Sequence, residues 1–186
     1  MEERNDQQLI SDYLNGDERA LRLLFSRYLK TIYNFTYRFT GNIENAEDVT
    51  QETFLKVWKN LKKYDPEQNF KTWIFAIARN TALDLLRKKK DFVFSDFENE
   101  DGTNTIADSL TDAEPLPYEL LLRAERTREL EKILNDVPPL YREVLLLHYY
   151  NEFTFDEISK ILNKPLDTIK SQHRRGITIL RKLLNN

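Results

Sequence analysis

The sequence of 186 residues contains no cysteine. This absence excludes disulfides, thiolate metal ligands and cysteine nucleophiles, and it fits the reducing environment of the cytoplasm. With only four glycines and six prolines there are few turns, and the abundance of Leu, Lys, Glu, Arg and Ile favours helices over strands. The charged start, MEERNDQQLI, has no apolar signal-peptide core, and no later run approaches the roughly 20 apolar residues of a membrane span. We therefore expect an all-α protein that is cytoplasmic and not inserted in a membrane.

Histidine is scarce as well, and the net charge is only −3. Two histidines that are distant in the sequence provide no pair of nucleophile and base, so we expect no catalytic residue, no cofactor and no enzymatic activity. The slightly negative net charge means that any nucleic-acid contact must come from local patches of cations and not from the average field.

The acidic residues are unevenly distributed. Between Asp91 and Glu119 there are nine acids and no Lys or Arg, interspersed with Gly, Thr, Ser and Pro. This composition predicts a flexible acidic linker over residues 91–117. It would join two small helical domains, one over residues 1–90 and one over residues 118–186.

The first domain shows the boundaries of three helices. Asp17 is a suitable N-cap and Gly41 a suitable end for a long aromatic-rich helix. A second helix is expected over residues 43–63, before Asp65-Pro66. A third is expected over residues 70–90, after a cap at Asn69.

The second domain has the pattern of a helix-turn-helix. After a helix over residues 118–135, Pro138-Pro139 start another over residues 140–150. Thr154 and Glu157 have the spacing of a capping box for the short helix FDEISKIL, which ends at Asn163-Lys164-Pro165. The basic stretch IKSQHRRGITILRKLL follows, and a short helix, a tight turn and a longer basic helix are the elements of this motif.

The final helix has one apolar and one cationic side. Its inner stripe contains Ile169, His173, Gly176, Leu180, Leu183 and Leu184, and its outer side contains Lys170, Ser171, Arg174, Thr178, Arg181 and Lys182, flanked by Arg175. A solvated terminal helix is the alternative interpretation. The cations begin in the first turns, however, where a recognition helix meets base edges, and this favours DNA binding. Lys170 and Arg175 are candidates for guanine or phosphate contacts and Ser171 for either, whereas His148 either reaches the DNA backbone or is a half-buried, hydrogen-bonded histidine.

In the first domain, NIENAEDVTQETFLKVW presents an acidic helix face. Residues expected to point inward are Ile43, Ala46, Phe54, Val57 and Leu61, and residues expected to point outward are Glu44, Asp48, Gln51 and Glu52. Leu55 falls among the outward residues, and an exposed leucine in a polar patch indicates a partner surface, although an ordinary solvated face is the alternative. A carboxylate metal site is not expected, because helical di-metal sites also need histidines and both histidines lie beyond the linker.

The third helix, FKTWIFAIARNTALDLLRKKK, starts with aromatic residues and ends with cations. Ile74 and Ile77 are expected in the core. Phe70 and Trp73 are either core residues too or a wall for an unstacked base, with the cations at 87–90 holding phosphates.

Three stretches, GNIENAEDVTQETFLKVW, FKTWIFAIARNTALDLLRKKK and LNDVPPLYREVLLLHYYNEFTFDEISKILNKPLDTIKS, resemble in order and spacing the bacterial RNA polymerase sigma factors of the extracytoplasmic-function (ECF) class. The resemblance implies a sigma-two domain that docks on the clamp helices of β′ in core RNA polymerase and recognises and melts the −10 promoter element. It also implies a sigma-four domain that reads the −35 element and contacts the flap of β. An anti-sigma factor is a further partner that the family implies.

The resemblance also assigns residues. The polymerase-binding motif matches Asp48, Gln51 and Glu52, and the −10 helix matches Asn80, Asp84, Arg87 and Lys88, with the loop over residues 64–69 capturing a flipped base. The −35 contacts match Thr168, Lys170, Ser171, Arg174 and Arg175. The chain departs from the family at His173, where Leu or Ile is usual, and at Ile177, where Arg is frequent.

Two other functions fit parts of the sequence. A stand-alone helix-turn-helix regulator would use the final helix alone, but it usually binds as a symmetric dimer, and the sequence has no evident dimerisation heptad. A metal-dependent helical enzyme would use the acidic face, but it lacks ligands and a catalytic pair. The ordered set of motifs favours a sigma factor that directs promoter-specific initiation.

Overall fold

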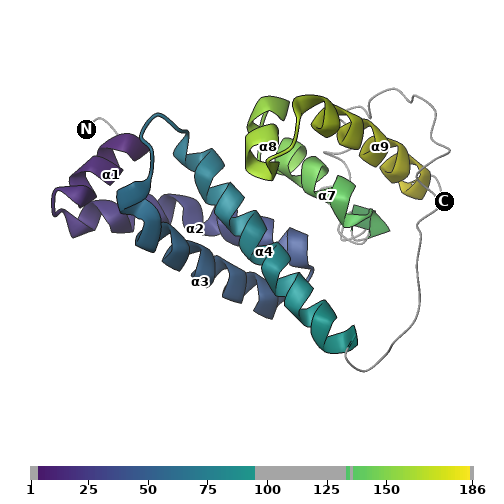
Figure 1. The fold of residues 1–186 in the computed structure, drawn as a ribbon, viewed down its shortest axis with the longest axis horizontal. Coiled ribbons are helices and arrows are strands. Elements are labelled where there is room, and N and C mark those ends of the chain that lie inside the picture. Colours follow the sequence, from purple (N-terminus) through teal and green to yellow (C-terminus); the bar gives the residue numbers. More distant parts are fainter. Residues whose placement is uncertain (1–3, 95–132, 135, 185–186) are drawn as a thin grey trace. The chain divides into compact units, whose positions relative to one another are not determined.

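The computed structural model describes residues 4–94, 133–134 and 136–184, with the backbone alone for residues 89–94. All regular structure in this part of the chain is helical, as predicted, and it divides into two compact units (Figure 1). Most of the predicted acidic linker and of the helix expected over residues 118–135 lies outside the described residues. No helix among the described residues is both long and apolar enough to cross a membrane.

The first unit is a small helical bundle. It consists of α1 (Asp6–Leu14), α2 (Glu18–Thr40), α3 (Ile43–Asn60), the 3-10 turn η1 (Leu61–Lys63) and α4 (Phe70–Phe94). α1 and α3 both pack on α2, and α4 runs along the bundle beside them (Figure 1). α4 continues to Phe94, past the lysines at which the sequence suggested its end.

The ends of these helices are set by local hydrogen bonds. The Asp17 carboxylate accepts from the backbone N–H of Arg19 at 3.0 Å, and Gly41 ends α2 with a φ of 69°, a left-handed conformation that glycine adopts without a steric penalty. The side chain of Asn69 accepts from the N–H of Thr72 at 3.1 Å and caps α4. All three boundary predictions are confirmed.

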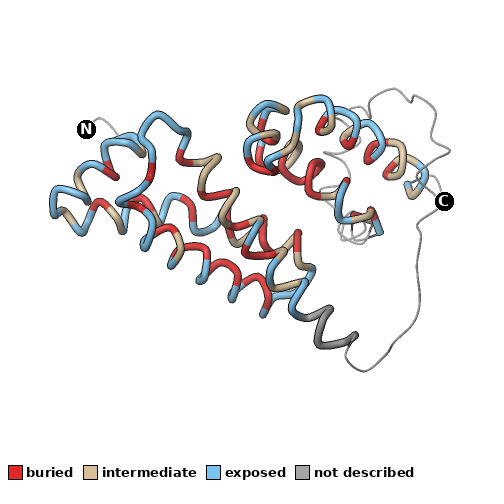
Figure 2. The backbone as a smooth tube through the Cα atoms, in the orientation of Figure 1, coloured by how far each residue is buried: buried red, intermediate tan, exposed pale blue. Residues whose placement is uncertain are grey.

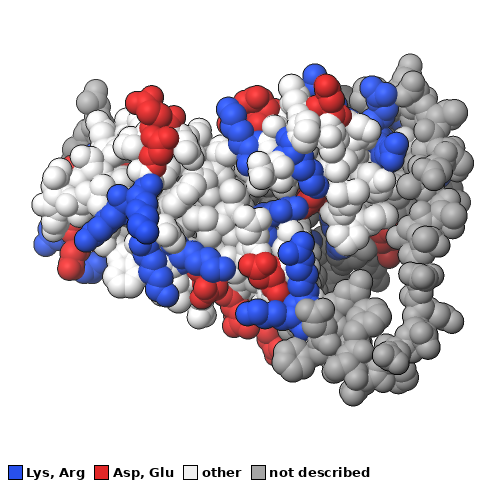
Figure 3. All heavy atoms as spheres, in the orientation of Figure 1, with Lys and Arg blue, Asp and Glu red and all other residues white. Residues whose placement is uncertain are grey.

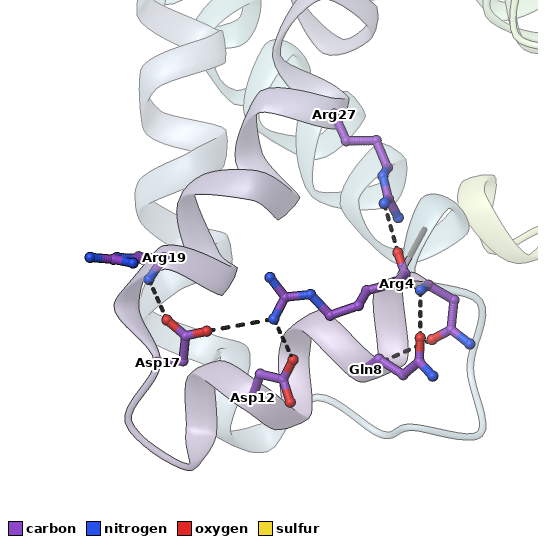
Figure 4. A network of polar contacts seen from close by, with 7 residues as sticks. Arg4, Gln8, Asp12, Asp17, Arg19 and Arg27 are labelled. Carbon is purple, nitrogen blue, oxygen red and sulfur yellow. Dashed lines mark hydrogen bonds and ion pairs between the residues drawn. The ribbon is translucent and has the colours of Figure 1, made fainter. Parts of the chain in front are cut away.

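Helix α1 was not expected from the sequence. Asn5 and Gln8 form a capping box at its start. Arg4, which precedes α1, pairs with Asp12 near the far end of this helix at 2.8 Å and with Asp17, the N-cap of α2, at 3.5 Å (Figure 4). These contacts tie α1 to the start of α2. These ion pairs are partly exposed, so they orient α1 more than they stabilise the unit.

The core of the first unit is aromatic and aliphatic, and the buried stripes of its helices face one another (Figure 2). The rings of Phe35 and Phe75 join α2 to α4 at a centroid distance of 5.2 Å. Ile43 corrects the sequence prediction, because it is 58% exposed instead of pointing inward. It is the first residue of α3, and side chains tilt toward the helix N-terminus, so this one projects past the packed turns.

The second unit contains the helix-turn-helix. α7 (Pro139–Leu145) continues as a π-helical segment, η3 (Leu146–Tyr150), and is followed by α8 (Phe155–Leu162) and α9 (Leu166–Leu184). α7 packs against α9. The two helices approach closely at Gly176, because a Cβ atom there would lie 3.2 Å from Cβ of Tyr141.

Candidate polymerase and nucleic-acid interfaces

The acidic face predicted on α3 is present. Its polar members are exposed, and the Leu55 side chain among them is 45% exposed. One turn further along the helix, Trp58 is 50% exposed and its indole N–H donates to the hydroxyl of Tyr13 on α1 at 2.8 Å. Trp58 was not predicted as part of this face from the sequence. The outward residues whose placement is confirmed are Glu44, Asp48, Gln51 and Glu52.

A hollow of about 870 Å³ lies between α3 and α4, and it brings two predicted sites together. Figure 3 shows acidic and basic side chains next to one another over these helices. The acidic face of α3 and the cationic end of α4 therefore line the same hollow. The lining residues are Asp48, Val49, Gln51, Glu52, Leu55 and Lys56 from α3, and Thr81, Asp84, Leu85, Arg87 and Lys88 from α4.

Lys56 lies between the acidic face of α3 and the residues of α4 matched to the −10 helix, and it was not among the residues predicted from the sequence. Its ammonium group donates to the Thr81 hydroxyl at 3.1 Å and lies 3.8 Å from a carboxylate oxygen of Glu52. The spacing of Glu52 and Lys56 by four residues was a readable signal for this pair.

A second hollow, of about 520 Å³, lies on the other side of Lys56. It contains the predicted pair Trp73 and Asn80, together with the cations Lys56 and Lys63. Its other lining residues are Asn60, Ile77 and Thr81.

Phe70 does not join this hollow. It is 3% exposed, and its ring packs edge-on against Tyr28 and Tyr64 and against Trp73 at centroid distances of 5.3, 5.6 and 5.7 Å. The expectation that the Phe70 ring forms a wall for an unstacked base is therefore wrong, because this ring is buried and packs against the ring of Trp73. Of the two aromatic residues, the half-buried Trp73 is the one that a base can reach.

The loop between η1 and α4 is closed by its own polar groups. Burial raises the pKa of the Tyr64 hydroxyl, which donates to the Gln68 carbonyl. Asp65 accepts from the backbone N–H of Glu67 at 3.0 Å. The side chains of Asp65, Gln68 and Asn69 remain exposed, so the loop is a fixed backbone with polar groups facing solvent.

In the second unit, Thr154 and Glu157 form the predicted capping box of α8, with the backbone N–H of Thr154 donating to Glu157 at 2.8 Å.

The turn between α8 and α9 is held by a charged pair. Asn163 adopts a left-handed φ of 50° in this turn. Lys164 donates to Glu143 of α7 at 2.8 Å, and the Glu143 side chain is only 4% exposed. Because a buried carboxylate needs this partner, the pair fixes the turn against α7.

Helix α9 presents the predicted cations to solvent. Thr168 and Thr178 are half-buried at the edge of this face. Ile177, at a position where the family frequently has Arg, is 1% exposed. Its side chain therefore lies in the core and not on the exposed cationic face. The exposed residues are Lys170, Ser171, Arg174 and Arg175.

His148 is half-buried behind this face. Its Nδ1 donates to the Phe153 carbonyl at 2.9 Å, and its ring stacks on Phe155 with a centroid distance of 4.6 Å. These contacts agree with the structural alternative for His148, and its DNA-backbone contact stays a prediction. Burial, together with the neighbouring His148, lowers the pKa of His173 to about 4.

Within the described residues, no group of three or more Asp, Glu and His side chains has the geometry to hold a metal ion.

Comparisons with known proteins agree with this geometry. The sigma-70 region 2 family matches residues 24–92, and the sigma-70 region 4 family matches residues 127–180. The CnrH structure in complex with the cytosolic domain of CnrY covers 97% of both chains with a TM-score of 0.69 at 22% identity, which supports the fold. The sigma factor RpoE of Bartonella quintana, in complex with the anti-sigma factor NepR, covers 88% of this chain and 96% of its own, with a TM-score of 0.68 at 24% identity.

Sequence relatives carry the same assignment over nearly the whole chain. The ECF RNA polymerase sigma factor SigW of Bacillus subtilis is 32% identical over 95% of both chains. The RNA polymerase sigma-H factor of Pseudomonas aeruginosa is 30% identical over 98% of this chain and 95% of its own. The protein therefore belongs to the ECF class of the sigma-70 family, and it is a non-enzymatic sigma factor that directs promoter recognition by RNA polymerase.

Proposed function

We propose that the acidic face of α3 docks on the clamp helices of β′ in core RNA polymerase. Carboxylates surround the exposed Leu55, and Trp58 extends the apolar centre. An apolar anchor within a polar rim is the usual form of a protein interface, and the carboxylates favour a basic partner. The chief support is the hollow between α3 and α4, which joins this face to the residues matched to the −10 helix.

The proposal assigns the −10 element to the two hollows beside α4. Trp73 offers a half-buried ring for an extruded base, Asn80 offers an amide, and Lys56 and Lys63 offer cations for phosphates. Stacking on an aromatic side chain offsets the loss of base stacking in the duplex, so this surface favours the melted strand. Asp84, Arg87 and Lys88 border the neighbouring hollow at the other side of Lys56.

The −35 element is assigned to α9. Lys170, Ser171, Arg174 and Arg175 form an exposed face in its first turns, where a recognition helix enters the major groove. Thr168 sits at the start of this face, and the flap of β is the expected neighbour of the unit in the holoenzyme. The cytoplasm, where core polymerase and promoters are found, is the proposed location.

An anti-sigma factor is part of the proposal too. The sigma factor RpoE of Bartonella quintana was solved in complex with the anti-sigma factor NepR. A protein of this class that covered the acidic face would keep this chain from core polymerase.

Charge reversal on α3 tests the polymerase contact. Glu52→Lys should weaken the affinity for core polymerase at least about tenfold, because it places a cation against a basic partner. Glu18→Lys is the control, since Glu18 is an exposed acid of the same unit that lies on α2 and not on the acidic face of α3. Equal affinities of the two variants, with intact helical circular dichroism, would refute the assignment of this face.

A further inference from the structure

Four rings from three elements meet behind the exposed face of α9, and we call them the ring joint. His148 and Tyr149 come from η3, Phe155 from α8 and His173 from α9. The ring of His173 lies 5.0 Å from Phe155, 5.2 Å from His148 and 5.6 Å from Tyr149, measured between centroids. Both histidines of the chain are therefore in one cluster.

The ring joint contains a directional hydrogen bond as well as apolar ring contacts. The Tyr149 hydroxyl and Nε2 of His173 share a hydrogen bond of 3.0 Å. The π-helical geometry of η3 lets two consecutive residues, His148 and Tyr149, both reach the ring of His173. A leucine at position 173 could fill the same space, but it could not fix an angle through a hydrogen bond.

The ring joint lies close to the exposed side chains of α9, so a small rotation of this helix about its axis would move those side chains. His173 directly precedes the exposed Arg174 and Arg175 and follows Ser171 by two residues. On a helix with side chains at a radius of about 6 Å, a roll of about 10° displaces them by about 1 Å. A displacement of this size is enough to break the geometry of a hydrogen bond to a base edge.

We propose that Tyr149 and His173 are positioning residues for −35 recognition: their hydrogen bond fixes the rotation of α9 about its axis and so the register of its cations against the bases. The inference rests on the proposed −35 role of α9. It gives His173, where the family usually has an aliphatic residue, a role in the specificity of this chain. In the described part of the chain, the titratable rings in contact with His173 are His148 and Tyr149 of η3, and α8 contributes the uncharged ring of Phe155.

The test uses the full chain assembled with core polymerase and a promoter selected by that holoenzyme from a library. The measured quantity is the ratio of occupancy on this promoter to occupancy on the same promoter with a scrambled −35 element. Tyr149→Phe removes only the hydroxyl, His173→Leu removes the imidazole partner of that hydroxyl, and His173→Gln keeps a polar group near the position of Nε2. Circular dichroism confirms that every variant is folded at the assay temperature.

The proposal predicts that Tyr149→Phe and His173→Leu each lower the ratio about three- to tenfold, the range of one hydrogen bond. The double variant should lose no more than either single one, because both remove the same bond. His173→Gln should stay within about twofold of the unmodified chain, and discrimination of the −10 element should not change. An unchanged ratio for Tyr149→Phe, or losses that multiply in the double variant, would overturn the proposal.

Two further variants separate the failure of the joint from the failure of the proposed function. Lys170→Ala and Arg175→Ala alter the exposed face itself. If both leave the ratio and the binding to either promoter unchanged, α9 does not contact the −35 element, and the inference falls together with that assignment. If they weaken binding to both promoters alike, their contacts are to phosphates and the Tyr149→Phe result alone decides the inference. If they lower the ratio while Tyr149→Phe does not, the assignment stands and the ring joint is refuted.

Discussion

Lowering the pH from 7 to 5 is expected to destabilise the second unit through a single side chain, His173. Its pKa is lowered from the ordinary 6.5 to about 4, because burial among the rings disfavours the imidazolium and His148 lies beside it. Between these two values the unfolded chain binds a proton that the folded chain does not. Stability that is complete above about pH 6.5 is therefore lost as the pH falls toward 4.

The size of this destabilisation follows from the shift in the pKa of His173. Integrating the proton binding of the folded and unfolded states between pH 7 and pH 5 gives a loss of about 2 kcal/mol in the free energy of unfolding. Other groups titrate in the same range, so His173→Leu is the control that removes the proton-binding site of this side chain; its lost contacts lower the stability at every pH, and the comparison uses only the change with pH. The free energy of unfolding of the His173→Leu chain should fall by about 2 kcal/mol less over the same interval.

Chemical denaturation at pH 7, 6 and 5 measures this difference. The amide signals of α9 in NMR spectra report on the second unit. Both tryptophans, Trp58 and Trp73, lie in the first unit, so their fluorescence gives an internal control from the same sample. Equal losses for the two chains, or an imidazole of His173 that titrates near 6.5 in the folded protein, would refute the reasoning.

Three other predictions concern the second unit. Lys170→Ala and Arg175→Ala should each weaken −35-dependent binding by about 1 to 3 kcal/mol where the contact is to a base; where the contact is to a phosphate, binding to the scrambled −35 element should weaken equally and the salt dependence should fall, as salt-titrated binding to both promoters shows. Glu143→Gln should lower the free energy of unfolding by about 1 to 3 kcal/mol, because the amide that replaces the carboxylate no longer neutralises the charge of the partly buried Lys164 ammonium; Lys164→Met added to it should restore part of this loss. Gly176→Ala should bring no gain in stability, because crowding of Tyr141 and Leu145 on α7 offsets the roughly 1 kcal/mol by which alanine exceeds glycine within a helix, and a gain of that size in thermal unfolding would contradict that packing.

Features that depend on neighbours in the sequence were predicted well. Asp17, Gly41 and the capping box of Thr154 with Glu157 define helix ends through contacts within a few residues, and all were confirmed. The exposed acidic face of α3 and the exposed cations of α9 were also predicted, because helical periodicity alone separates the two faces of a helix.

Features that depend on packing between elements were predicted less well. Periodicity placed Ile43 inward and left Phe70 as a candidate for base binding, but only the neighbouring helices decide which turns are covered. The ring joint, the pair of Glu143 with Lys164 and the hydrogen bond of Lys56 to Thr81 each join residues more than 20 positions apart, so no local pattern indicates them.

Helix α1 was missed for another reason. Its capping residues, Asn5 and Gln8, have a readable spacing, but the segment is short and strongly polar, with only Leu9 and Ile10 buried. The two rival functions, a stand-alone regulator and a metal-dependent enzyme, are set aside by membership of the sigma family over nearly the whole chain.

Site-specific photocrosslinking in one promoter complex tests the central claim most directly. A crosslinking residue at position 80 or at position 171 replaces an exposed side chain of α4 or α9, and the holoenzyme is bound to its selected promoter. We predict crosslinks from position 80 to the −10 element and from position 171 to the −35 element. Crosslinks in the reverse order, or none to promoter DNA from either position, would contradict the division of promoter recognition between the two units.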